Sequence, residues 1–492
     1  MTHVENQMGN LKQRILHGGS WMLFSRVVIQ ILSLLRTAVT ARILVPEDFG
    51  LLGIAVIVVA FIERVTTVNL NLFLMQKTES IHEDIDTIWT IGVLKGIFFY
   101  GIIFFSAPFV VGFFGTPGAV NVLRVIALVF VINSFVNGAL VYLQKNMEME
   151  KLSYSKIVAA IVETGVTLGM VFLLRNVWAI IFGTLASYLT NMLMSFLIYP
   201  RMPRLEIKWE KLKDCFLFGK WLYFGKMTAY CIQYGDNATV GKMMGQGALG
   251  LYQMAYRLGM LPFDELSQAL NNIVYPVYIK LKTEDARLKK FFLKSIEWQV
   301  AVIIPLVIMM VFFSKGVVSL LLGDKWLNMV VCFQIIAIVG FFKHFHSHNG
   351  LLLLAKGKPQ VAAWGGAIQL VIMGALIIPL TLWMGIEGAA TAVLLGTFIA
   401  ALFSLFMAFK EVRLRITDLG SALAGPLCAC IFMSLVLWGF SWWIAAHAMG
   451  GMVVGMGLSL FVYLGVLLLF DHWQAGELLI DLRKWTGWKF LG

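Results

Sequence analysis

The chain has 492 residues, of which 59% are hydrophobic and 13% are charged, and its formal net charge at pH 7 is +12. A soluble domain carries roughly 25% charged residues, so this composition excludes an ordinary soluble protein and indicates a chain that lies mostly in lipid. The sequence contains no GxxxxGK[ST] loop, which excludes nucleotide hydrolysis by that route.

Apolar stretches of about 20 residues recur along the whole chain, and each is long enough to cross a bilayer as a helix. Fourteen helices are predicted, and two of the connections are so short that the expected number of crossings is twelve to fourteen. The fold class is therefore an all-α integral membrane protein. In chain order the predicted helices cover residues 18–44, 50–76, 87–114, 119–144, 157–174, 177–199, 216–241, 249–278, 296–322, 327–354, 360–385, 388–409, 419–446 and 452–470.

Basic residues gather in alternate connections between these helices, on the side that also holds the amino terminus. The positive-inside rule places that side in the cytoplasm, together with both termini if the number of crossings is even. Anionic lipid of the inner leaflet then accounts for the positive charge, and no nucleic-acid partner is predicted. These basic segments are 1–17, 77–86, 145–156, 200–214, 280–294, 356–358, 410–418 and 471–492.

A repeat at an offset of 200 residues relates the two halves of the chain. The segment 41–55 reappears as 241–255, and the Gly-Ser-Trp of 19–21 reappears as the Gly-Lys-Trp of 219–221. Matching halves with an even number of crossings share one orientation, which predicts two six-helix lobes related by a pseudo-two-fold axis along the membrane normal. The predicted parts are an amino-terminal lobe 1–200, a second lobe 201–410, and an additional helix pair with a cytoplasmic tail 411–492.

Polar residues follow one face of the first helix and one face of its repeat partner. A spacing of four, three and four residues keeps side chains on one side of a helix, so both helices are predicted to line a polar cavity. Arginine and lysine on that cavity suit an anion, while amides and hydroxyls suit a sugar. The two stripes are Arg26, Gln30, Ser33 and Thr37, and Lys226, Tyr230, Gln233 and Asn237.

A longer polar stripe follows helix 249–278, and a dense polar cluster lies in helix 327–354. Arg257, Gln268, Asn271 and Lys343 are predicted to line the same cavity. His344 and His348 lie one turn apart, which leaves three interpretations: a packed cluster, a protonation-sensitive cavity wall or a metal site. Because there is no HExxH motif and no third ligand, no metal or cofactor is predicted.

Opposite charges occupy matched positions in the two repeats. Arg36 corresponds to Asp236, and Arg64 corresponds to Asp264. These pairs are interpreted either as structural bonds between the lobes or as gating pairs that exchange between conformations. Membrane-embedded carboxylates are also candidates for proton or sodium coupling. Glu163 is preferred because its own segment offers no charged neighbour, Glu63 is a second candidate, and the alternative is a carboxyl hydrogen-bonded to a neighbouring helix.

Two stretches are similar to a known family. The sequence Ala-Arg-Ile-Leu-Val-Pro-Glu-Asp-Phe-Gly-Leu at 41–51 and Gly-Gln-Gly-Ala-Leu-Gly-Leu-Tyr at 245–252 resemble Wzx-type polysaccharide transporters of the multidrug/oligosaccharidyl-lipid/polysaccharide exporter superfamily. Chain length and the lysine-rich segment after Pro276 resemble the colanic acid exporter branch.

This resemblance implies a flippase, not an enzyme, in the bacterial inner membrane. It would carry undecaprenyl-pyrophosphate-linked oligosaccharide repeat units by alternating access, for exopolysaccharide, capsule or O-antigen synthesis. Membrane lipid and other polysaccharide assembly proteins are candidate partners. The alternative is a cation-coupled multidrug antiporter of the same superfamily, for which carboxylates and aromatic residues should dominate the cavity. A membrane glycosyltransferase is disfavoured because the outer connections are short.

Overall fold

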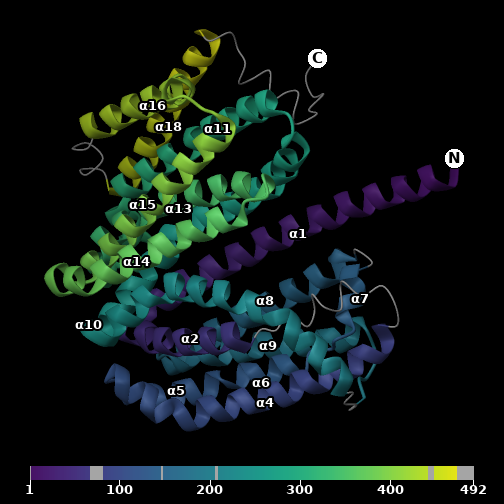
Figure 1. The fold of residues 1–492 in the computed structure, drawn as a ribbon. Coiled ribbons are helices and arrows are strands. Elements are labelled where there is room, and N and C mark those ends of the chain that lie inside the picture. The colour runs from purple at the N-terminus through teal and green to yellow at the C-terminus, as the bar shows by residue number, and fades with distance from the viewer. Residues whose placement is uncertain (1, 67–80, 146–147, 205–208, 441–447, 474–492) are drawn as a thin grey trace. The chain divides into compact units, whose positions relative to one another are not determined.

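A computed structural model describes residues 2–66, 81–145, 148–204, 209–440 and 448–473, and the described chain is helical throughout (Figure 1). It divides into two compact units. Unit 1 comprises residues 1–253 with 321–325, and unit 2 comprises 254–320 with 326–492. The three-part division drawn from the sequence, with boundaries after residues 200 and 410, stays a prediction. The end of predicted helix 50–76 and most of the carboxyl-terminal tail lie outside the described residues.

Unit 1 is built from the amino-terminal helices and the first part of a long tenth helix. Its first two helices are joined by a very short turn, in agreement with the short connection between predicted helices 18–44 and 50–76. The helices are α1 (Thr2–Ile43), α2 (Pro46–Thr66), α4 (Ile81–Phe114), α5 (Ala119–Ile126), α6 (Leu128–Ser134), α7 (Leu140–Lys145), α8 (Met149–Leu174), α9 (Trp178–Ile198) and α10 (Trp209–Leu281).

The prediction of a single helix over 119–144 is wrong. The segment forms three short helices, α5, α6 and α7, with the widest break around Asn137. The Asn137 amide donates to the carbonyls of Tyr199 at 2.8 Å and Arg201 at 2.9 Å, while its oxygen accepts from the Ala139 amide at 3.0 Å. An asparagine that bonds backbone groups in this way competes with helical hydrogen bonds, so the helix ends before it.

Helix α10 has a sharp kink that divides it where two helices are predicted. Gly245 has φ +82° and ψ −178°, a backbone conformation outside the helical region. A residue without a Cβ adopts a positive φ at little cost, so glycine permits the direction of the chain to change here. The kink falls between predicted helices 216–241 and 249–278.

Unit 2 contains the second part of α10 and the remaining helices. Predicted helix 296–322 begins eleven residues earlier than expected and is interrupted at Phe313. The helices are α11 (Asp285–Phe312), α12 (Ser314–Leu322), α13 (Val330–Ala355), α14 (Pro359–Met384), α15 (Ile386–Val412), α16 (Ile416–Gly439) and α18 (Ala448–Trp473), with a 3-10 helix η1 (Asp324–Met329) shared with unit 1.

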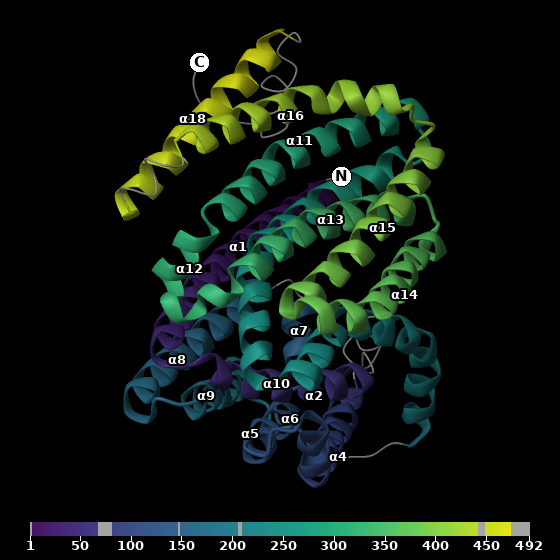
Figure 2. The same ribbon diagram turned by 90° about the vertical axis from the view of Figure 1, so that its left-hand side faces the viewer.

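Long helices pack side by side within each unit. In unit 1, α8 lies along α9 and α1, and α4 packs on α5 and α6. In unit 2, α15 packs on α13 and α14, and α16 packs on α11 and α18, as Figure 2 shows. Buried apolar residues from α4, α5 and α9, including Ile103, Leu123 and Ile181, form a core of unit 1.

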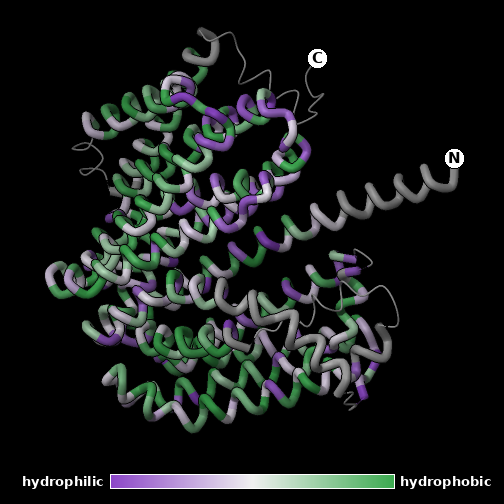
Figure 3. The backbone as a smooth tube through the Cα atoms, in the orientation of Figure 1, coloured by the Kyte–Doolittle hydropathy of each residue, from purple (hydrophilic) through white to green (hydrophobic). Residues whose placement is uncertain are grey.

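The surface of these helices is strongly apolar. Hydrophobic residues, green in Figure 3, cover long stretches of the coloured helices. Large apolar side chains point outward, such as Phe109, which is 81% exposed, and Trp383, which is 80% exposed. Within the described residues, ten helices are long and apolar enough to cross a membrane. The chain is therefore a multi-pass membrane protein, because such a surface is stable against lipid and not against water.

Candidate functional site

Charged side chains from three helices of unit 1 interact with one another. Glu63 and Arg64 lie near the end of α2, Lys95 lies in α4, and Lys226 lies in α10. Lys95 interacts electrostatically with both Lys226 and Glu63, and Lys226 interacts with Arg64. Three cations and one carboxylate linked in this way carry an excess of positive charge, which favours an anionic ligand.

Polar and aromatic residues of α10 continue this group. The Arg64 guanidinium donates to the Gln233 side-chain oxygen at 3.2 Å. The Tyr230 ring lies 5.2 Å from the Tyr234 ring and 5.3 Å from the Phe61 ring. The Tyr230 hydroxyl donates to the Ile57 carbonyl at 2.9 Å, so in this conformation it is engaged by the protein and is not free for a sugar hydroxyl.

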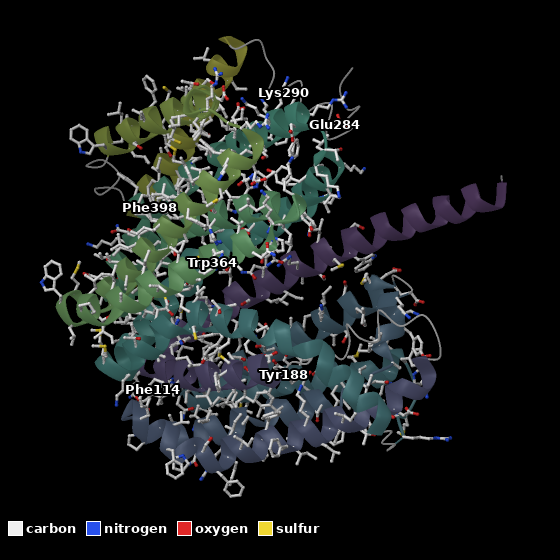
Figure 4. All side chains as sticks on the ribbon, in the orientation of Figure 1. Phe114, Tyr188, Glu284, Lys290, Trp364 and Phe398 are labelled. Carbon is white, nitrogen blue, oxygen red and sulfur yellow. The ribbon has the colours of Figure 1, made fainter. Side chains whose placement is uncertain are left out.

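An ion pair between α1 and α8 is linked to this group through Tyr188. Arg36 Nη1 is 2.5 Å from Glu163 Oε1. Tyr188, from α9 and labelled in Figure 4, interacts electrostatically with both Glu163 and Glu63. These interactions connect the pair to Glu63 and, through Glu63, to Lys95. We call the whole set the unit 1 polar cluster, comprising Arg36, Glu163, Tyr188, Glu63, Lys95, Lys226, Arg64, Gln233 and Tyr234.

The expected pairing of Arg36 with Asp236 does not form in this structure. Asp236 is fully buried, and it accepts hydrogen bonds from the Tyr252 hydroxyl at 2.8 Å and from the Asn237 backbone and side-chain nitrogens at 2.7 and 2.9 Å. Neutral donors therefore satisfy its carboxylate. Asn237 is only 6% exposed and is held by Asp236, so it does not face open space as the cavity prediction requires.

The reasoning that favoured Glu163 also needs correction. The sequence shows no charged neighbour in its own helix, but the structure supplies Arg36 from α1 as a partner. Lys95, Tyr188 and Tyr234 are absent from the predicted cavity. A lysine within an apolar span was a signal for Lys95, whereas no pattern in the sequence distinguishes the two tyrosines.

The remaining cavity residues predicted in unit 1 lie on α1. Arg26, Gln30 and Ser33 are each partly exposed. The Ser33 carbonyl accepts a hydrogen bond from the Thr37 hydroxyl at 2.7 Å. Thr37 is buried, so the predicted stripe ends in a residue that bonds its own helix. Whether the other three residues contact a substrate stays a prediction.

Other predicted residues lie in unit 2. Asp264 Oδ1 is 3.4 Å from Lys343 Nζ, and both side chains are about half exposed. Arg257 and Gln268 are exposed, and Asn271 is partly exposed. Because Arg64 belongs to unit 1 and Asp264 to unit 2, the pairing of these two residues stays a prediction.

The histidine cluster of unit 2 forms a chain of buried hydrogen bonds. Ser267 Oγ lies 2.5 Å from His344 Nδ1, and His344 Nε2 lies 2.9 Å from Gln299 Oε1. Gln299 Nε2 is 2.6 Å from His348 Nδ1, and His348 Nε2 is 2.9 Å from the Tyr278 hydroxyl. Among the described residues, no three His, Cys, Asp or Glu side chains converge as metal ligands would. The geometry favours the packed-cluster interpretation.

Comparison with known proteins supplies the family. The family model described as "Polysaccharide biosynthesis protein" matches residues 39–331, which is more than half of the chain. The chain belongs to this family. The resemblance to Wzx-type flippases of the multidrug/oligosaccharidyl-lipid/polysaccharide exporter superfamily is thereby confirmed, and the protein is a membrane transporter of polysaccharide biosynthesis, not an enzyme.

Individual relatives are distant but cover most of the chain. The teichuronic acid biosynthesis protein TuaB of Bacillus subtilis is 22% identical, over 75% of this chain and 76% of its own length. The lipopolysaccharide biosynthesis protein WzxC of Escherichia coli is 21% identical, over 82% of both chains. A solved structure of the lipid II flippase MurJ in an inward closed conformation has a TM-score of 0.72 at 14% identity, covering 93% of this chain and 99% of the other. This last likeness shows the fold.

Proposed function

We propose that the protein is a flippase that translocates undecaprenyl-pyrophosphate-linked oligosaccharide repeat units across the bacterial inner membrane by alternating access. The product would serve exopolysaccharide, capsule or O-antigen synthesis. The observation that carries the proposal is the chain of electrostatic interactions that links Glu63, Lys95, Lys226 and Arg64 within unit 1. Charged side chains facing lipid are costly, so this group requires water or an ionic ligand beside it.

A pyrophosphate fits this group chemically. Arginine binds phosphate oxygens through a planar fork, and lysine adds compact positive charge. The Gln233 amide and the partly exposed ring of Tyr234 suit a sugar, while the polyprenyl tail would remain in lipid between helices. Arg26, Gln30, Ser33 and, from unit 2, Arg257, Gln268, Asn271 and Lys343 complete the proposed cavity.

The proposed membrane arrangement follows from the charge distribution. Both termini lie in the cytoplasm, twelve to fourteen helices cross the membrane, and two six-helix lobes alternate between inward and outward access. Arg64 and Asp264 are proposed to pair across the lobes in one of these states. Glu163 and Glu63 are the proposed ion-coupling carboxylates, and membrane lipid and other polysaccharide assembly proteins are the proposed partners.

The proposal is tested by reconstituting the full chain in proteoliposomes with a labelled undecaprenyl-pyrophosphate-linked oligosaccharide. Lys226→Met and Arg64→Met should each lower the flipping rate by about tenfold or more, since a hydrogen bond to a charged group contributes roughly 1.5–3 kcal/mol. Lys290→Met is the matched control, because Lys290 is exposed at the start of α11, in unit 2. A double Lys226→Met, Arg64→Met variant that flips at the parent rate would refute the proposed site.

The same liposomes discriminate the multidrug antiporter. A gradient-dependent uptake of a lipophilic cationic dye, combined with no flipping of the lipid-linked sugar, would favour that alternative. The excess of cations in the unit 1 polar cluster predicts the opposite result, because a cationic dye would be repelled by it.

A further inference from the structure

The Arg36–Glu163 pair lies where α1 packs along α8, within both membrane spans. Glu163 is close to the centre of Met149–Leu174, and Arg36 is within Gly18–Ile43. The side chains of Arg36 and Glu163 are 17% and 21% exposed, so the pair is mostly buried but still accessible from outside the protein. Either charge alone would be costly at this depth, and each neutralises the other.

Few ionisable groups surround Glu163. Arg36 faces it from α1, and Tyr188 faces it from α9. Glu63 of α2 interacts with the same tyrosine. Helix α7 also packs on α8, and its ionisable side chains are Tyr142 and Lys145. Among the described residues, Arg36 is therefore the cation in direct contact with the Glu163 carboxylate.

We propose that the Glu163 carboxylate and the anionic head group of the substrate compete for the Arg36 guanidinium. When the head group binds Arg36 and displaces Glu163, the Glu163 carboxylate takes up a proton. The site thus binds either an internal carboxylate or an external phosphate together with one proton. This inference rests on the proposed function, because it assumes that a lipid pyrophosphate reaches the unit 1 polar cluster.

The exchange keeps the charge around Arg36 balanced. A phosphate oxygen is a stronger bidentate partner for a guanidinium than a single carboxylate oxygen is, so a head group that reaches Arg36 can displace Glu163. The displaced carboxylate would then be an uncompensated charge at membrane depth. Taking a proton from water neutralises it and removes that cost. Without substrate the proton is released, and the Arg36–Glu163 pair forms again.

Thermodynamic linkage makes this exchange measurable. If the phosphate and the proton bind together, each strengthens the binding of the other by the same factor. Replacing Glu163 by a neutral glutamine removes both the competitor for Arg36 and the proton site. The Glu163→Gln variant should therefore bind the head group more tightly than the parent and take up fewer protons.

The test uses the purified full-length protein in detergent and farnesyl pyrophosphate as a short polyprenyl pyrophosphate probe. Titration calorimetry in buffers with different ionisation heats counts the protons taken up per probe bound. The parent should take up about one proton more than Glu163→Gln, whose affinity for the probe should be about tenfold higher, equivalent to roughly 1.4 kcal/mol. Glu150→Gln, an exposed position in the first turn of the same helix, should behave as the parent. Equal proton uptake by parent and Glu163→Gln would overturn the inference.

Infrared difference spectroscopy provides a measurement on the parent protein alone, in case the Glu163→Gln variant does not fold. Probe binding should produce the carbonyl stretch of a protonated carboxylic acid, shifted in heavy water. If the probe binds in a manner that requires Lys226 but the band is absent, the inference fails and the proposed function stands. If Lys226→Met and Arg64→Met leave probe binding intact, the proposed anion site itself is wrong.

Discussion

Gly50 and Gly250, which occupy equivalent positions in the two repeats, make reciprocal contacts within unit 1. A Cβ on Gly50 would overlap the carbonyl of Gln246, and a Cβ on Gly250 would overlap the carbonyl of Pro46, which is the repeat equivalent of Gln246. Gly50 meets Gln246, and their repeat equivalents, Gly250 and Pro46, meet in the same way. Such reciprocal contacts relate the two segments by a local two-fold axis. The beginning of α2 and the kinked part of α10 therefore pack as matched partners, which supports the proposal of two related lobes.

This close packing predicts that a single added methyl group is harmful at either position. Gly50→Ala and Gly250→Ala should each lower stability by roughly 1–3 kcal/mol, the usual cost of forcing an extra carbon into a packed interface. Thermal unfolding of the purified protein in detergent measures the effect. Gly101→Ala is the control, because a Cβ at Gly101 would meet no atom within 4 Å. If both variants melt at the same temperature as the parent, the two segments move apart without a loss of stability and this prediction is wrong.

The positions of most helices could be predicted from the sequence because each is a long apolar stretch. Predicted helices 360–385 and 388–409 agree with α14 and α15 to within a few residues. The three short helices over 119–145 could not be predicted, because the break at Asn137 depends on carbonyls of Tyr199 and Arg201, far along the chain. The hydrophobicity of the segment is the same whether or not that contact forms.

The candidate site was less predictable than the helices. A charged residue within a span is visible in the sequence, and so Arg36 and Glu163 both attract attention. Their partners depend on which helix faces come together. The repeat suggests Asp236 for Arg36, whereas the packing of α1 on α8 gives Glu163. Asp236 instead accepts from Tyr252, only sixteen residues away in the same helix.

The buried chain through Gln299 predicts a large loss of stability when that residue is changed. Gln299 is 1% exposed, and its amide bonds His344 at one end and His348 at the other. Gln299→Leu leaves both imidazoles without these partners, and an unsatisfied buried polar group costs roughly 1–3 kcal/mol. The melting temperature should therefore fall markedly. Gln268→Leu, at an exposed position of α10, should change it little. A Gln299→Leu protein that melts with the parent would contradict this account of the cluster.

The proposed pairing of Arg64 with Asp264 predicts a rescue. Within its own unit, Arg64 bonds Gln233, and Asp264 bonds Lys343. Arg64→Asp and Asp264→Arg should each slow flipping, and the double variant should recover part of the rate. A coupling energy of about 0.5–3 kcal/mol in a double-mutant cycle would identify partners. Arg64→Asp combined with Glu284→Arg, at an exposed acidic position between α10 and α11, serves as the control pair. Purely additive effects would leave the two residues unconnected.

Lys325 binds backbone carbonyls at the end of α1, so a change at this residue should loosen that end of the helix. Its ammonium group donates to the carbonyl of Arg42 at 3.1 Å and to the carbonyl of Leu44. The last carbonyls of a helix have no partner within the helix, and a cation there is stabilising by about 0.3–1 kcal/mol. Lys325→Met should therefore accelerate amide hydrogen exchange at the end of α1 and lower the melting temperature slightly. Lys315→Met, at an exposed lysine in the first turn of α12, should do neither. Hydrogen exchange followed by mass spectrometry resolves this segment, and equal exchange at residues 40–48 in the two variants would show that Lys325 does not hold the helix end.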